Sequence, residues 1–251
     1  MRVDALLFDK DGTLFDFHHT WGPWVGQVIE ELGEGDRDRG AALASALGYD
    51  LATKKYFPNS PLIACTNRQA AEYITGVLLH LDVSEIEHYL TASAQDVPLA
   101  PVVPLDVFLI GLKHRGLKLG VMTNDSEVGA RAHLTAAGIV GCFDFIAGFD
   151  SGYGAKPDPD PLLAFARALG LDPSRVVMVG DSLHDLVAGR AAGMQTVGVL
   201  TGPACRAELA PCADAVCGAR LPGHLASRCR DWRADASQHC PCLFASGHCC
   251  C

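Results

Sequence analysis

Two aspartates separated by one residue lie near the amino terminus, in the segment Asp9-Lys10-Asp11-Gly12-Thr13. They follow an apolar run at residues 3–8 that is typical of a buried strand. Alternate side chains of an extended backbone point the same way, so Asp9 and Asp11 are expected to face one side. Such a pair could supply a nucleophile and a general acid/base. Asp and Gly are also common in polar turns, which is the alternative interpretation of this segment by itself.

Two more groups of polar residues follow apolar runs later in the chain. Thr123 and Asn124 come after residues 117–122, and Asp181 comes after residues 176–179. Asp185, four residues beyond Asp181, is expected on the same face of a helix start. An N-cap at that helix would also use such residues, but the paired acids before it favour metal binding.

The apolar runs alternate with helical patterns. Strands are predicted at residues 3–8, 117–122, 176–179 and 196–200, and helices at residues 105–114 and 185–192. This alternation predicts an α/β fold: a doubly wound parallel sheet, that is, a Rossmann-like core. The carboxyl ends of parallel strands meet at one edge of the sheet, where ligands bind. The polar segments can therefore converge on one site.

The segment between the first two strands has a different pattern. Residues 25–32, 41–47 and 70–81 have helical periodicity, and no strong strand is expected between residues 16 and 96. Prolines at positions 98, 101 and 104 then mark the return to the core. We expect a core formed by residues 1–15 and 97–221, with residues 16–96 as an inserted small helical cap domain.

Together with Lys156 in Ala155-Lys156-Pro157-Asp158-Pro159, these motifs make the chain resemble the haloacid dehalogenase-like superfamily over about residues 3–202. The resemblance is to phosphoglycolate phosphatase-like members with a small helical cap. It implies that Asp9 is the nucleophile and Asp11 the general acid/base. It also implies that Thr123 and Lys156 bind phosphate and that Asp181 is a magnesium ligand.

Each of these roles has a physical reason. A carboxylate that attacks phosphorus forms an aspartyl-phosphate, and a second group must then activate water. Carboxylates repel a phosphoryl group unless a cation intervenes, which calls for a hard, oxygen-liganded ion such as Mg²⁺. Asp9, Asp181 and the backbone carbonyl of Asp11 suit that ion. We expect Asp185 to be a supporting residue that orients Lys156 or metal-bound water.

The phosphate is expected to meet donors from three places. Lys156 offers positive charge, the Thr123 hydroxyl offers a hydrogen bond, and turn amides near Gly12 and Asn124 offer backbone N–H groups. Lys10 departs from the apolar residue usual between the two aspartates. It is expected to point away from Asp9 and Asp11 and to be structural, paired with a neighbouring acid.

The function predicted from these residues is hydrolysis of a small organic phosphomonoester, such as phosphoglycolate, with Mg²⁺ as cofactor. Superfamily dehalogenases, which attack carbon, lack the second aspartate, so Asp11 favours phosphorus. A phosphomutase acting on a sugar phosphate is an alternative, because it uses the same groups. Cap groups that could contact the leaving group, each of which could instead be structural, are His18, His19, Trp21, Trp24, Lys54, Lys55, Tyr56, Asn67 and Arg68, with His184 from the core.

Composition narrows the partners. The 251 residues are 49% hydrophobic and carry a net charge of −9, which argues against nucleic acid and anionic membranes as partners. No apolar run is long enough for a bilayer span, so a cytoplasmic protein with a small-molecule partner is expected. The sequence makes no prediction of oligomeric state.

The carboxyl-terminal end is unusual in composition. Nine of the 11 cysteines follow position 200. Residues 222–251 are expected to form a disordered, Cys-rich extension, while a zinc site and a shifted reading frame are alternatives. A noncatalytic metal-binding protein acting through this extension is therefore a third hypothesis for the function.

Overall fold

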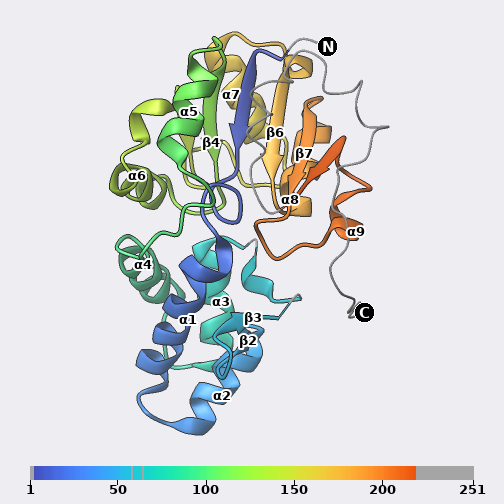
Figure 1. Ribbon diagram of the computed structural model, residues 1–251. Coiled ribbons are helices and arrows are strands. Elements are labelled where there is room, and N and C mark those ends of the chain that lie inside the picture. Colours follow the sequence, from blue (N-terminus) through green and yellow to red (C-terminus); the bar gives the residue numbers. More distant parts are fainter. Residues whose placement is uncertain (1–2, 58, 64, 219–251) are drawn as a thin grey trace.

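The computed structural model describes residues 3–57, 59–63 and 65–218. One parallel sheet forms its core, in the strand order β5-β4-β1-β6-β7-β8 (Figure 1). Each neighbouring pair in this sheet is parallel. The strands are β1 (Ala5–Phe8), β4 (Lys118–Met122), β5 (Phe145–Ala147), β6 (Val176–Gly180), β7 (Gln195–Val199) and β8 (Ala215–Cys217).

Helices cover both faces of the sheet because side chains alternate along its buried strands. Leu6 and Phe8 of β1 join the apolar cluster that contains α5 and α6, whereas Ala5 and Leu7 join the cluster that contains α7 and α8. The fold class predicted from the sequence is confirmed. The helices of this part are α5 (Leu105–Lys113), α6 (Glu127–Ala136), α7 (Asp160–Leu169), α8 (Leu183–Ala191) and α9 (Arg206–Leu209).

The segment between β1 and α5 forms a helical body that lies beyond the carboxyl ends of the strands, in the lower half of Figure 1. It has its own apolar cluster, to which Phe17, Trp21 and Tyr56 belong. We call this body the cap. Its elements are α1 (Phe17–Gly33), α2 (Arg37–Ala46), β2 (Tyr49–Asp50), β3 (Lys55–Tyr56), α3 (Asn67–Val77) and α4 (Val83–Ser93).

The two-residue strands β2 and β3 form a small antiparallel pair that the helical pattern did not predict. Tyr49 and Tyr56 are partners in this pair, and their rings pack edge to face at 5.6 Å between centroids. Packing of the two rings therefore stabilises a pair of strands that is too short to be detected from sequence periodicity.

The chain enters and leaves the cap at one place. The Asp16 N–H donates to the Ala100 carbonyl at 2.7 Å, and the Ala100 N–H donates to the Thr20 hydroxyl at 3.4 Å. Phe15 also forms a bridge with Pro101. The cap is thus attached to the core by two adjacent connections.

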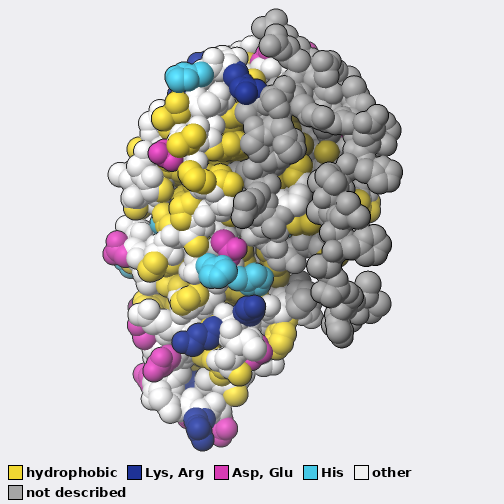
Figure 2. Space-filling model, viewed as in Figure 1, with side chains coloured by type: hydrophobic (Ala, Val, Ile, Leu, Met, Phe, Trp, Pro, Cys, Tyr) yellow, Lys and Arg dark blue, Asp and Glu magenta, His cyan; other side chains and the backbone are white. Residues whose placement is uncertain are grey.

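The outer surface carries some hydrophobic side chains. Figure 2 shows them in the upper part of the molecule, where α5 and α6 lie in Figure 1. Val107 and Ile110 of α5 and Val128 of α6 are exposed. Among the described residues, no helix is both long and apolar enough to cross a membrane. The Cys-rich extension expected at residues 222–251 lies outside the described residues.

Candidate active site

Three neighbouring strands bring the polar segments together. β1 lies between β4 and β6 and pairs with both in parallel, so the carboxyl ends of all three strands lie at the same edge of the sheet. Asp9 follows β1, Thr123 follows β4 and Asp181 follows β6. The Asp9 N–H donates to the Val179 carbonyl at 2.9 Å, which fixes the start of the first loop against β6.

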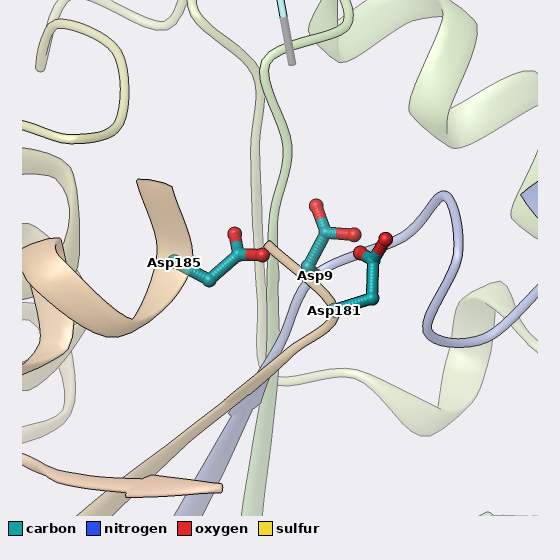
Figure 3. Close-up of side chains that lie close together, drawn as sticks. All are labelled: Asp9, Asp181 and Asp185. Carbon is teal, nitrogen blue, oxygen red and sulfur yellow. The ribbon is translucent and has the colours of Figure 1, made fainter. Parts of the chain in front are cut away.

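Three buried carboxylates gather at this edge. Asp9, Asp181 and Asp185 each have an oxygen within 4.8 Å of the other two. Figure 3 shows Asp9 and Asp181 with their carboxylates side by side and Asp185 reaching toward them from α8. The Ser182 N–H and hydroxyl both donate to Asp185 Oδ2, at 3.0 and 2.7 Å. This capping box fixes Asp185 at the start of α8.

Lys156 supplies the positive charge beside these carboxylates. Its buried Nζ donates to Asp9 Oδ1 at 2.6 Å, to Asp185 Oδ1 at 2.6 Å and to the Met122 carbonyl at 2.9 Å. All three donors of the ammonium are therefore used. Burial acts to lower the pKa of Lys156, but the charges of Asp185 and Asp9 outweigh burial and raise it. The ammonium stays charged at any working pH.

Asn124 holds the Lys156 loop. Its side-chain amide donates to the Lys156 carbonyl, and its Oδ1 accepts from the Lys156 N–H, both at 2.9 Å. The side chain of Asn124, which the sequence placed among the phosphate-binding residues, thus anchors the backbone of another residue of the site.

The cluster has an excess of negative charge. Burial, reinforced by the charges of Asp185 and Asp11, raises the pKa of Asp9 from 3.8 to about 7 despite the opposing charge of Lys156. Burial, with Asp9 and Asp185 nearby, raises the pKa of Asp181 well above its usual value. One ammonium does not balance the charge of three carboxylates, so the cluster can accept a further cation.

The surroundings of Asp181 fit such a cation. A Cβ at Gly12 would lie 2.3 Å from Asp181 Oδ2, and a Cβ at Gly202 would lie 1.6 Å from it. A side chain at position 12 or 202 would collide with the Asp181 carboxylate, so both positions require glycine. Gly12 also has a positive φ of 86°. All side-chain ligands in reach are oxygens, which hard divalent ions such as Mg²⁺ prefer.

Asp11 points toward the cap instead of toward the carboxylate cluster. The Trp21 indole N–H of α1 donates to Asp11 Oδ1 at 2.8 Å. Lys10 Nζ lies 2.7 Å from Asp11 Oδ2. The expectation that Lys10 points away from Asp11 is therefore wrong. β1 ends at Phe8, so strand alternation no longer governs Lys10.

Thr123 and Gly12 are two further residues of the site. Thr123 is 2% exposed, and its Oγ1 accepts from the Asp125 N–H at 3.1 Å, which leaves the hydroxyl proton to donate. The Gly12 carbonyl accepts from the Thr201 hydroxyl, and this contact ties the first loop to the segment after β7.

A cavity of about 110 Å³ lies between the core residues and the cap. From the core, Asp9, Asp11, Thr123, Asn124, Lys156, Asp181, Asp185 and His184 line it. Of the cap groups suggested by the sequence, Trp21, Trp24, Tyr56 and Asn67 line it, whereas His18, His19, Lys54, Lys55 and Arg68 do not. Arg68 instead pairs with Glu72 and Glu87 on the cap surface. The cap wall of this cavity is therefore mainly aromatic and aliphatic.

Sequence reasoning missed two side chains next to the site. Asp125 lines the cavity, and its Oδ2 lies 3.3 Å from Lys10 Nζ. His133 of α6 is fully buried, with Nδ1 2.9 Å from the same Nζ. Asp125 stands next to Thr123 and Asn124, a position that could have suggested it. Nothing in the sequence singles out His133.

The model of the haloacid dehalogenase-like hydrolase family matches residues 3–193. A phosphoglycolate phosphatase of Neisseria meningitidis is 44% identical over 201 residues, 80% of this chain and 82% of its own. One from Aquifex aeolicus is 30% identical over 206 residues, 80% and 86% of the two chains.

Solved structures share the fold. CbbY from Rhodobacter sphaeroides, crystallised in complex with phosphate, superposes with a TM-score of 0.62 at 23% identity, covering 88% of this chain and 98% of its own. The family match runs from β1 through the cap to the end of α8. The chain is therefore an enzyme that belongs to the haloacid dehalogenase-like hydrolase family, in its phosphatase class.

Proposed function

We propose that this enzyme hydrolyses a small organic phosphomonoester through an aspartyl-phosphate at Asp9, with Mg²⁺ as cofactor. One observation carries the proposal: the hydrogen bond from Lys156 Nζ to Asp9 Oδ1, 2.6 Å long, within a cluster of buried carboxylates. A buried carboxylate beside a fixed ammonium can bring its oxygen to a phosphorus whose own oxygens the ammonium binds.

In the first step, an Asp9 oxygen forms a bond to phosphorus while the ester P–O bond breaks. Asp11 donates a proton to the leaving oxygen, so the product alcohol departs neutral. In the second step, Asp11 takes a proton from a water that attacks the phosphorus of the aspartyl-phosphate. Phosphate departs, and the Asp9 carboxylate is restored.

The other residues hold the phosphoryl group. Lys156 would bind its oxygens by exchanging the hydrogen bond to Asp9 Oδ1 for one to the phosphoryl group, and the Thr123 hydroxyl and backbone N–H groups near Gly12 and Asn124 would bind them too. Asp9, Asp181 and the Asp11 backbone carbonyl would hold Mg²⁺, which neutralises phosphate charge and orients the group when bound. Asp185 keeps Lys156 in position through its 2.6 Å hydrogen bond.

The cavity limits the size and polarity of the leaving group. Its volume of about 110 Å³ suits a small one, and phosphoglycolate is the first candidate because the relatives carry that name. The aromatic part of the cap wall, formed by Trp21, Trp24 and Tyr56, also suits a leaving group with apolar surface. Phenyl phosphate therefore belongs in the same substrate panel.

The test is phosphate release from a panel of phosphomonoesters by wild type and Asp9→Asn, with Mg²⁺ and with chelator. We expect release that requires Mg²⁺ and is lost in Asp9→Asn while the variant stays folded. Release at the wild-type rate from Asp9→Asn would refute the mechanism. Transfer of labelled phosphate to a sugar in preference to water would indicate the phosphomutase alternative.

A further inference from the structure

We infer that Lys10 is a positioning residue for Asp11, which it holds against the docked cap for proton transfer to the leaving group. This inference rests on the proposed function. It starts from the burial of Lys10, whose side chain is 0% exposed although lysine is among the residues least often buried.

The Lys10 ammonium has three N–H donors and lies among the side chains of Asp11, His133 and Asp125. Nζ donates to Asp11 Oδ1 at 2.9 Å, with Asp11 Oδ2 at 2.7 Å, and lies 2.9 Å from His133 Nδ1. Asp125 Oδ2, 3.3 Å away, forms an ion pair with the ammonium but accepts no hydrogen bond. Burial acts to lower the pKa of Lys10, but the charges of Asp11 and Asp125 outweigh it and raise the pKa. Lys10 is thus a fixed cation that binds the Asp11 carboxylate from the core side.

Trp21 binds the same carboxylate from the cap side. Its indole N–H donates to Asp11 Oδ1 at 2.8 Å, and its ring centroid lies 5.2 Å from Lys10 Nζ, within range of a cation–π contact. Asp11 is therefore held between a residue of the first loop and a residue of α1. Moving α1 away would remove one of its two side-chain donors.

His133 connects Lys10 to the other end of the cap. Because Lys10 donates to Nδ1, the proton of the neutral ring is on Nε2, which lies 2.7 Å from the Ala94 carbonyl at the end of α4. The Trp21 and His133 rings are 5.7 Å apart. Lys10 therefore lies where the first and last helices of the cap both contact the core.

Stability alone does not account for this arrangement. A buried ion pair costs desolvation, and replacing one with apolar residues is often neutral or stabilising. What the pair does provide is a single orientation for the Asp11 carboxyl group, which transfers the proton when it is protonated.

The test compares two substrates that differ in their need for that proton. The alkoxide of phosphoglycolate must be protonated as it leaves, whereas p-nitrophenolate leaves readily without a proton. If the enzyme prefers another alkyl phosphate of the panel, that compound replaces phosphoglycolate. The quantity measured is kcat/KM, which covers the steps up to transfer of phosphorus to Asp9 and is independent of the later attack by water.

For Lys10→Met we expect kcat/KM with the alkyl phosphate to fall about 10²-fold, the range of general acid catalysis. With p-nitrophenyl phosphate it should change only a few-fold. Trp21→Phe keeps an aromatic ring and the buried charges but removes the N–H, and should give the same selective loss, about tenfold. This second variant tests the inference even if Lys10→Met fails to fold.

Trp24→Phe is the matched control. Trp24 lies on the same helix and also lines the cavity, but its N–H donates to Ser93 Oγ. Because Trp24 forms part of the aromatic wall but donates no hydrogen bond to Asp11, any loss in this variant should not be selective for the alkyl phosphate. Equal losses in Trp21→Phe, or in a folded Lys10→Met, would overturn the inference and leave the proposed function intact. A wild type that releases no phosphate from either substrate would overturn both.

Discussion

Replacing Asp9 with asparagine should stabilise the metal-free protein while removing its activity. Asp9 is buried next to Asp181 and Asp185, and its pKa is raised from 3.8 to about 7, chiefly by burial. The folded state therefore favours the protonated form of Asp9. The stability that protonated Asp9 contributes to the folded state is fully present below pH 3.8 and is lost as pH rises through about 7.

The size of the effect follows from the shift. About three pKa units correspond to about 4 kcal/mol of unfolding free energy that the ionised Asp9 costs at pH 8. Asparagine has no charge and avoids this cost. It also loses the ion pair with Lys156, so about 4 kcal/mol is an upper bound. For a chain of this size that is a rise in Tm of at most about 10 °C.

The assay is thermal unfolding of both proteins in chelator at pH 8 and at pH 5. At pH 5 wild-type Asp9 is largely protonated in the folded state, so the gain should be less than half of that at pH 8. Adding Mg²⁺ at pH 8 should narrow the gap, because a cation that binds the native cluster stabilises wild type by mass action. Asp96→Asn controls for the loss of one acidic charge, because Asp96 is exposed.

Two results would refute this reasoning. One is an Asp9→Asn protein no more stable than wild type at pH 8 in chelator. The other is an equal gain at pH 5 and pH 8, because a gain independent of pH cannot come from the titration of Asp9.

Three further substitutions test other parts of the structure. Gly120→Ala would place a Cβ 2.6 Å from the Phe165 ring, so overpacking should cost about 1–3 kcal/mol in denaturant unfolding. Gly12→Ala forces a side chain at φ 86° against the Asp181 carboxylate, and misplacing a catalytic group by about 1 Å should lower kcat about 10²-fold in the phosphate-release assay. Thr66→Ala removes the hydroxyl from the N-cap of α3 and should cost about 1 kcal/mol, while Thr66→Ser should retain most of the stability.

The sheet could be predicted because its central strands are continuous apolar runs that end in polar motifs. β1, β4, β6 and β7 all fall within or next to the predicted segments. β5 and β8 have three residues each, which is too short for periodicity to distinguish from loop. The short strands of the cap escaped prediction for the same reason.

The candidate site was predictable to the extent that each residue follows a strand of a parallel sheet. The contacts of Lys10 were not, because they depend on residues far along the chain. His133 is 123 residues away and is brought to Lys10 by the packing of α6. The sequence named Trp21 only among several cap residues that could contact the leaving group or be structural, and the docking of α1 gives it Asp11 as a partner.

The position of β1 in the sheet has a consequence for synthesis of the protein. β1 precedes the other strands in the chain, and its partners are β4 and β6, so its pairing on both sides can be completed only after residue 180 has left the ribosome. The cap helices end at Ser93 and can collapse on their own apolar cluster well before then. Domains generally fold as units in the order of synthesis. The cap should therefore fold first, and the sheet, with Asp9 at the end of β1, should be completed last.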